Sequence, residues 1–223
     1  MARWAPEKKD QLASLADEIL HNYGHGRAVV AIDGPTGAGT RAFADDLADE
    51  FRRRNISVFR ASVEDFHRPR KERERAGWLS PRAQYEDAYD YSLLRRILLD
   101  PFHTAGSTGF VLAGFDEKRD QTIHQPKWIT AGPDAILIID GAFLNRPELA
   151  GGWNFSFWLT TEPEVGLARF AAAGAEHSDP DVLARQRGAD ELYIAEADPA
   201  NRASAIIDNT DPDQPRRVFA DSC

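Results

Sequence analysis

Cysteine is almost absent from this chain of 223 residues, in which Cys223 is the single example. One cysteine cannot close a disulfide within the chain or build a cysteine-based metal site, so an oxidising compartment is not required. Long apolar runs are absent too, since the longest, residues 135–139, is far shorter than the ~20 residues of a membrane span. The first ten residues lack the apolar centre of a signal peptide. We therefore expect a cytoplasmic protein that has no membrane partner.

Positive charge is also in short supply, because 27 Lys and Arg stand against 36 Asp and Glu and give a net charge of -9. This balance argues against nonspecific attraction to nucleic acid, so a phosphate-binding surface has to be local. Among the six histidines only His21 and His25 have a spacing typical of transition-metal ligands, and Gly24 interrupts the helix between them. Hydrophobic residues make up 42% of the chain and charged residues 28%, ordinary values for one soluble domain or two small ones. No repeat or low-complexity linker divides the chain, so we expect a single domain over residues 1–223.

Apolar patterning predicts strands and helices that alternate along most of the chain. Short apolar runs indicate strands covered on both faces, and apolar residues at helical spacing indicate amphipathic helices. We expect an α/β fold in three layers, with a mostly parallel central sheet and helices on both faces. The charged segment 64–82 is expected to be a loop, and residues 105–130 a hairpin or a substrate-side insertion. Strands are expected over 28–32, 57–61, 135–139, 155–159 and 205–207, and helices over 7–23 within a leading segment 1–26, around 43–51, over 91–99, after 161 and over 181–197.

A glycine-rich segment lies between the expected strand 28–32 and the helix that follows it. Gly34 and Gly39 have the spacing of a phosphate-binding P-loop, in which backbone N–H groups turn around phosphate oxygens at a helix N-terminus. Such a loop ends in lysine and then serine or threonine, whereas Thr40 and Arg41 occupy those positions here. A glycine-rich turn without a ligand is the alternative. The predicted phosphate-contacting residues are Gly34, Pro35, Thr36, Gly37, Ala38, Gly39, Thr40 and Arg41.

Acidic residues follow two further strands and precede one helix. Glu64 and Asp65 come after strand 57–61, Asp140 ends strand 135–139, and Asp90 stands before helix 91–99. In an open parallel sheet, ligands bind beyond the carboxyl ends of the strands, so these are candidate site residues. Each has a structural alternative: a solvated charged loop for Glu64 and Asp65, a turn for Asp140 and a helix N-cap for Asp90.

In this order, the motifs resemble those of the kinase group that contains uridine kinase, phosphoribulokinase and bacterial pantothenate kinase. The segment from Ser62 to Arg68 is similar to the D-x-F-[YH] motif of that group, and Asp140-Gly141 to its acid-glycine strand end. The similarity runs from about Val29 to Asp211. It implies a P-loop, nucleoside kinase-like fold, ATP and Mg²⁺ as cofactors, and a nucleoside-like small molecule as substrate.

The resemblance also implies residue roles. Glu64 takes the position of the catalytic aspartate, Asp65 is the base if the alignment shifts by one, and Arg41 replaces the missing lysine. Thr40 and Asp140 are the implied magnesium ligands. The implied substrate-binding residues are His67, Arg68, Asp90 and Arg169.

Two departures from that group fall on functional positions. The histidine and arginine that uridine kinases carry after the motif at 115–117 are replaced by Asp120, Gln121 and Thr122, which leaves the phosphate acceptor open. In the implied lid, residues 168–190, Arg169 is followed by apolar residues, so Arg185 and Arg187 are the remaining cations. Two hypotheses follow. The first is an ATP-dependent phosphotransferase that acts on a hydroxyl of a nucleoside-like or other sugar-bearing substrate. The second is a catalytically degenerate relative that keeps the fold and acts as a binding or regulatory protein. Homo-oligomer formation is left open.

Overall fold

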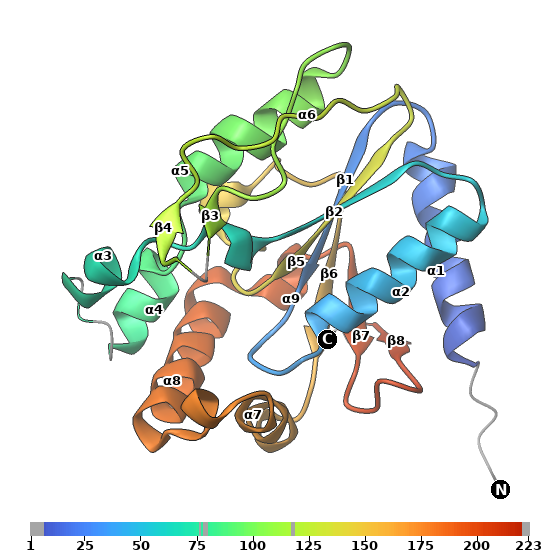
Figure 1. The fold of residues 1–223 in the computed structure, drawn as a ribbon. Helices are drawn as coiled ribbons and strands as arrows, with labels where there is room; N and C mark the ends of the chain where they lie inside the picture. Colours follow the sequence, from blue (N-terminus) through green and yellow to red (C-terminus); the bar gives the residue numbers. More distant parts are fainter. Residues whose placement is uncertain (1–6, 76, 78–79, 117–118, 220–223) are drawn as a thin grey trace, which may run out of the picture.

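The computed structural model describes residues 7–75, 77, 80–116 and 119–219, and a six-stranded sheet forms its centre (Figure 1). The strand order is β2-β5-β1-β6-β7-β8, with β8 antiparallel to β7 and the other pairs parallel. Residues 1–6 of the expected leading segment and Cys223 lie outside the described residues. The strands are β1 (Ala28–Asp33), β2 (Val58–Ser62), β5 (Ile136–Gly141), β6 (Phe155–Thr160), β7 (Ala205–Asp208) and β8 (Arg216–Val218).

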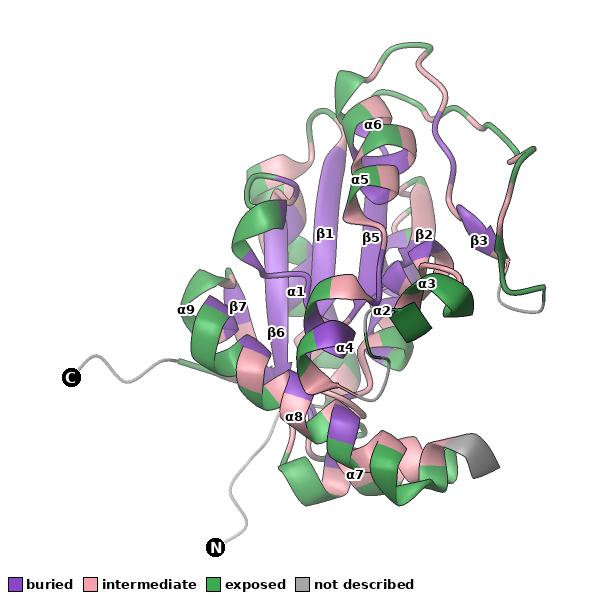
Figure 2. Ribbon diagram, turned by 90° about the vertical axis from the view of Figure 1, so that its left-hand side faces the viewer, coloured by how far each residue is buried: buried purple, intermediate pink, exposed green. Residues whose placement is uncertain are grey.

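Central strands β1 and β5 are buried along their whole length, as their continuous apolar runs predict (Figure 2). They pair in parallel with Ile32 opposite Asp140, and β2 pairs with β5 so that Ser62 is also opposite Asp140. The carboxyl ends of β1, β2 and β5 therefore meet at one edge of the sheet. This alignment brings the residues that follow the three strands to a common place.

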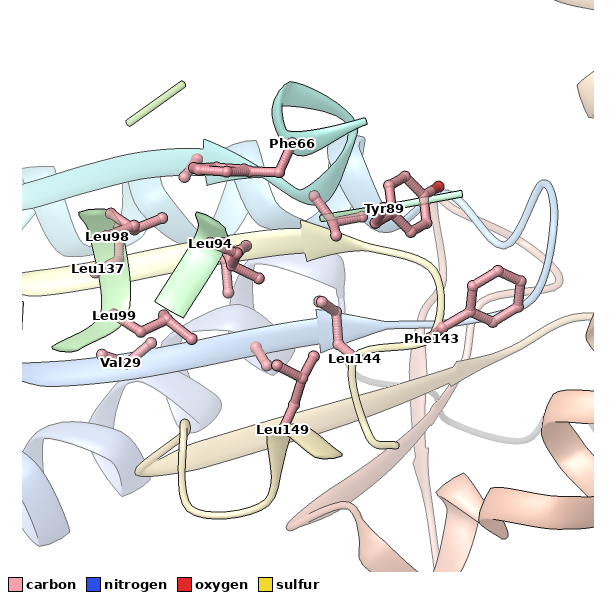
Figure 3. Packing of buried hydrophobic residues seen from close by; sticks show 14 of the residues in the cluster. Val29, Phe66, Tyr89, Leu94, Leu98, Leu99, Leu137, Phe143, Leu144 and Leu149 are labelled. Atoms are coloured by element: carbon pink, nitrogen blue, oxygen red, sulfur yellow. The ribbon is translucent and has the colours of Figure 1, made fainter. Parts of the chain in front are cut away.

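Helices cover both faces of the sheet and enclose two separate apolar cores (Figure 1). Helices α1 (Lys8–Tyr23) and α2 (Thr40–Arg53) bury residues such as Leu15 and Phe51 against one face. The opposite core includes Phe66, Leu94 and Leu144 (Figure 3). The helices over that side are α4 (Pro81–Asp87), α5 (Tyr91–Leu94), α6 (Asp100–Thr104) and α8 (Pro180–Ala197).

The remaining elements are short. Between α5 and α6 the chain forms a π-helical turn, Arg95–Leu99, so helix runs without a break through the predicted 91–99 segment. Strands β3 (Phe115–Asp116) and β4 (Gln121–Thr122) form a small hairpin within the expected region 105–130. Other elements are α3 (Arg70–Arg75), α7 (Pro163–Ala172), α9 (Pro199–Arg202) and the 3₁₀ turns Val63–Phe66, Pro147–Leu149 and Ala175–Ser178. No described helix is both long and apolar enough to span a bilayer.

Two secondary-structure predictions were wrong. Segment 64–82, expected as a loop, contains helical turns and the start of α4, because local caps outweigh its high charge. Ser80 accepts a hydrogen bond from the Ala83 N–H, and Pro81 occupies the first turn of α4, both of which favour a helix start. The sheet also continues beyond 205–207, since β8 adds an antiparallel edge strand whose two arginines hid it from an apolar pattern.

Candidate functional site

The glycine-rich loop joins β1 to α2 and has a left-handed backbone at two positions. Gly37 has φ +74° and Gly39 has φ +83°, conformations that side-chain-bearing residues rarely adopt. A Cβ at Gly37 would lie 1.9 Å from the carbonyl oxygen of Gly166 in α7, so only glycine fits there. The Asn209 Nδ2 donates to the Ala38 carbonyl oxygen over 2.7 Å. Helix α7 and the segment after β7 therefore hold the loop in a turn like that of a phosphate-binding loop.

Asp33, the last residue of β1, anchors the base of this loop from inside the protein. Its Oδ1 accepts from the Gly34 N–H at 2.9 Å, and its Oδ2 accepts from the Asn145 N–H at 2.8 Å and from the Tyr193 hydroxyl. Complete burial raises the pKa of Asp33 to about 6, although these hydrogen bonds act in the opposite direction. Asp33 was not among the predicted site residues, although an acid that ends an apolar strand is a signal in the sequence.

Helix α8 places a carboxylate on the loop itself. Asp190 Oδ2 accepts a hydrogen bond from the backbone N–H of Thr36 at 2.9 Å. Asp190 Oδ1 is buried and has no hydrogen-bond partner among the described residues. Burial raises the pKa of Asp190 to about 6, against the hydrogen bonds from Thr36. One N–H group of the loop thus already faces an anionic oxygen, which is the kind of ligand expected of such a loop.

A cavity of about 270 Å³ opens next to this contact. Its walls include Thr36 of the loop, Leu167 of α7, and Arg187, Asp190 and Ile194 of α8. Arg187, one of the two remaining lid candidates, points its Nη2 to Glu164 at 2.8 Å. The cavity therefore combines apolar walls with a small number of charged groups, which is typical of small-molecule sites.

Glu64 lies in the 3₁₀ turn after β2 and is held by two donors. His67 Nε2 is 2.7 Å from Glu64 Oε2, and the Tyr89 hydroxyl donates to Oε1 at 2.7 Å. Burial opposes ionisation, but the hydrogen bond and charge of His67, with the hydrogen bond from Tyr89, lower the pKa of Glu64 to about 2. His67 Nδ1 faces the Ala88 carbonyl oxygen at 3.0 Å, so acceptors lie beside both ring nitrogens. Glu64 is consequently a firmly ionised carboxylate with a partner at each of its two oxygens.

Asp65 occupies a different environment one residue later. Burial raises the pKa of Asp65, while the charge of Arg41 and a backbone hydrogen bond from Ser62 oppose this shift. The Ser62 side chain in turn accepts from the N–H of Glu64 and so caps the start of the 3₁₀ turn. Of the two neighbouring acids, Asp65 is the one whose basicity is increased.

Asp140, at the end of β5, is almost completely buried and faces two arginines. Its Oδ1 accepts from Arg60 Nη2 at 2.7 Å, and its Oδ2 lies 3.3 Å from the Ser62 hydroxyl and 4.0 Å from Arg41 Nε. Burial raises the pKa of Asp140, and the charge and hydrogen bond of Arg60 act against this shift. Arg60 was not among the predicted site residues; its signal is a charged residue in an otherwise apolar strand, here facing an acid on the adjacent strand.

The structure brings four of the predicted residues together at the N-terminus of α2: Arg41, Glu64, Asp65 and Asp140. Electrostatic interactions link this group, because the charge of Arg41 lowers the pKa of all three acids. These residues come from α2, the turn after β2 and the end of β5, and the sheet order places those elements next to one another.

Other predicted residues have structural partners. Asp90 caps α5, with its Oδ1 accepting from the Leu93 N–H at 2.8 Å. Arg169 donates to the carbonyl oxygens of Asn209 and Thr210 and so ties α7 to the segment after β7. Arg68 lies 4.0 Å from Glu72 in an exposed ion pair. These contacts place Asp90 and Arg169 in supporting positions around the site.

The predicted magnesium ligands do not form a typical site for a divalent cation. Arg41 stands where a P-loop supplies a hydroxyl, and the Thr40 methyl group packs towards Gly34. Both oxygens of Asp140 already face donors. Among the residues that the structure describes, no group of three or more His, Cys, Asp or Glu side chains is placed to hold a metal. The side chains present therefore do not fit the ion that the resemblance implies.

Comparison with known proteins identifies the fold. No family model and no curated protein sequence matches the chain. A protein named as a possible uridine kinase from Bacillus stearothermophilus matches with a TM-score of 0.70 and 22% identity, over 89% of this chain and 97% of that chain. A candidate fructose transport system kinase from Silicibacter sp. TM1040 gives a TM-score of 0.63 and 24% identity, over 86% and 94%. The predicted fold class is confirmed: the chain has the three-layer fold of the uridine kinase-like P-loop kinases.

Proposed function

We propose that this chain is an ATP-dependent phosphotransferase that acts on a hydroxyl group of a nucleoside-like or other small sugar-bearing substrate. The observation that supports it best is the convergence of Arg41, Asp65 and Asp140 beside a loop in which Gly37 and Gly39 have positive φ. The two similar structures described above are named as kinases. We place the reaction in the cytoplasm, with a small molecule as substrate and no nucleic acid or membrane as partner.

Asp65 suits the role of general base better than Glu64. A base that accepts the proton of a hydroxyl group works best when its pKa is not far below the ambient pH. His67 and Tyr89 hold the pKa of Glu64 at about 2, whereas burial raises the pKa of Asp65. The hydroxyl proton would pass to Asp65 as the substrate oxygen bonds to the γ-phosphorus and the bond to the β–γ bridging oxygen breaks, which leaves ADP. Arg41 would neutralise charge on the transferred group.

The substrate would approach from the side of the 3₁₀ turn. His67 and Arg68 follow this turn directly, and we propose that they face the acceptor, together with Asp90. Arg169 would act indirectly by fixing the segment around Asn209. ATP would occupy the loop after displacing the carboxylate of Asp190.

A binding or regulatory protein without catalytic activity is the second candidate. The observation that favours it is that the chain's own side chains already occupy two of the acids: His67 contacts Glu64, and Arg60 forms an ion pair with Asp140. The loop also lacks the lysine that normally reaches the β- and γ-phosphates. Both candidates require nucleotide binding, so they differ only in whether transfer follows.

The two candidates are separated by measuring ATP binding and phosphoryl transfer on the same samples. Transfer is assayed against a panel of nucleosides and free sugars. We expect Asp65→Asn to lower kcat about 10²-fold or more and Glu64→Gln to have a smaller effect. Asp49→Asn, the same change at an exposed acid of α2, is the matched control and should leave kcat unchanged. ATP binding without transfer to any acceptor would favour the binding protein, and no binding at millimolar ATP would exclude both.

A second variant tests the loop itself. Thr40→Lys combined with Arg41→Thr restores the usual order of cation and hydroxyl at the start of α2. If changes in the loop are what limit the rate, this double variant should transfer phosphate faster than the natural chain. An inactive double variant would place the limitation among the acids.

A further inference from the structure

We propose that the guanidinium of Arg41, backed by the Arg60–Asp140 ion pair, takes the place of a divalent cation beside the loop, so that the chain binds the polyphosphate of a nucleotide in its metal-free form. This inference rests on the proposed function only in that the loop receives a nucleotide. It concerns which positive charge neutralises the bound polyphosphate, an arginine or a metal ion.

The position of Arg41 is the first observation. Arg41 is the second residue of α2, at the place where a P-loop carries the hydroxyl group that binds magnesium. Its side chain is 66% exposed, and its Nε lies 4.0 Å from Asp140 Oδ2. The guanidinium thus lies beside Asp140, the acid implied as a magnesium ligand. Because the Arg41 side chain is exposed, it has room to turn towards a phosphate. Arginine matches phosphate oxygens with paired N–H donors.

The ion pair behind Arg41 is the second observation. Arg60 donates from Nη2 to Asp140 Oδ1 at 2.7 Å, from Nη1 to the Ile138 carbonyl oxygen at 3.1 Å and from Nε to Asp45 Oδ1 at 3.0 Å. Its side chain is only 16% exposed, so these bonds fix its position. A divalent cation at Asp140 would have to displace a buried, hydrogen-bonded guanidinium and would then lie close to Arg41. Both arginines therefore disfavour a cation at this place.

The loop supplies the third observation, independent of the arginines. The Thr36 N–H holds a carboxylate oxygen of Asp190 at 2.9 Å, while the other oxygen of that carboxylate is buried without a partner among the described residues. The loop N–H thus already donates to an anionic oxygen, and that oxygen belongs to a side chain of the protein itself. A phosphate oxygen that replaces the carboxylate would meet the same N–H group.

Calorimetric titration of the full chain with ATP tests this inference, once in EDTA and once in excess MgCl₂. Inorganic tripolyphosphate is a second probe, because it lacks the base and the sugar. We expect ATP to bind in EDTA at least as tightly as in MgCl₂. Arg41→Gln should weaken binding in EDTA by about tenfold or more, as expected for the loss of a charged hydrogen bond. Arg52→Gln removes the same charge from an exposed site further along α2 and should change the affinity by less than about twofold.

The variant Asp140→Asn distinguishes whether Asp140 serves as a partner of the two arginines or as a magnesium ligand. The two roles predict changes of ATP affinity in opposite directions. Without the carboxylate charge, Arg41 and Arg60 are freed to act on the ligand, so metal-free binding should become tighter. If Asp140 instead holds magnesium, the same variant should weaken binding in MgCl₂ and leave binding in EDTA unchanged. Thermal unfolding of each variant confirms that it is folded before titration.

Three outcomes overturn the inference. They are ATP binding at least about tenfold tighter in MgCl₂ than in EDTA, an Arg41→Gln variant that binds like the natural chain, and weaker magnesium-dependent binding by Asp140→Asn. Binding and transfer that depend on magnesium would refute only this inference and leave the proposed kinase intact. No binding of ATP or tripolyphosphate under either condition would refute the proposed function as well.

Discussion

Replacing Asp190 by asparagine should stabilise the protein near neutral pH and much less in acid. The carboxylate of Asp190 is held against the Thr36 N–H, where burial raises its pKa from 3.8 to about 6. A carboxyl group whose pKa is higher in the folded state than in the unfolded state binds its proton more tightly when the protein is folded. Its contribution to stability is complete at pH values below the pKa of the unfolded state. That contribution is lost as the pH rises through the pKa of the folded state. Ionised Asp190 therefore lowers the free energy of unfolding at neutral pH.

The size of the effect follows from the shift in the pKa of Asp190. Two pKa values that differ by about two units correspond to about 3 kcal/mol at pH 7.5, as an upper estimate, and to about 1 kcal/mol at pH 4.5. In the variant, an amide group would lie where Asp190 Oδ1 now lacks a partner, which costs about 1 kcal/mol at either pH. The stability gain of Asp190→Asn should thus be about 2 kcal/mol larger at pH 7.5 than at pH 4.5. For a chain of this size, that difference corresponds to about 4–8 °C in Tm.

Urea unfolding at the two pH values measures this difference directly, with thermal melts as a second readout. Asp181→Asn is the matched control, because it makes the same change in the first turn of α8, where the side chain is exposed. The control should show the same change in stability at both pH values. If Asp190→Asn and Asp181→Asn depend on pH alike, the burial of an ionised carboxylate against the loop is refuted.

Two further substitutions test the packing around the loop. Tyr193→Phe removes a hydroxyl that donates to the buried Asp33, so we expect urea unfolding to show a loss of about 1–3 kcal/mol, and an unchanged midpoint would contradict this role. Gly37→Ala would bring a Cβ to 1.9 Å from the Gly166 carbonyl oxygen at a φ of +74°, and the free energy of unfolding should fall by about 2 kcal/mol or more. Gly132→Ala, at a position with open space around it, is the control, and equal stability of the two alanine variants would disprove the contact between loop and α7.

The architecture and the position of the glycine-rich turn could be predicted from the sequence. Continuous apolar runs predicted β1 and β5, and the alternation of strands and helices predicted a parallel sheet covered on both faces. The spacing of Gly34 and Gly39 predicted a tight turn at the start of α2, where Gly37 and Gly39 do adopt positive φ. These features could be predicted because they depend on periodicity and backbone conformation, which neighbouring residues control.

Which acids have a lowered pKa and which have a raised pKa could be seen only in the tertiary structure. Glu64 and Asp65 are adjacent and equally acidic in the sequence, yet His67 and Tyr89 lower the pKa of the first while burial raises that of the second. The same holds for Asp190, which is 154 residues away from the loop N–H that it accepts. Desolvation and hydrogen bonding depend on how helices and strands pack in space, so a pattern along the chain cannot reveal them.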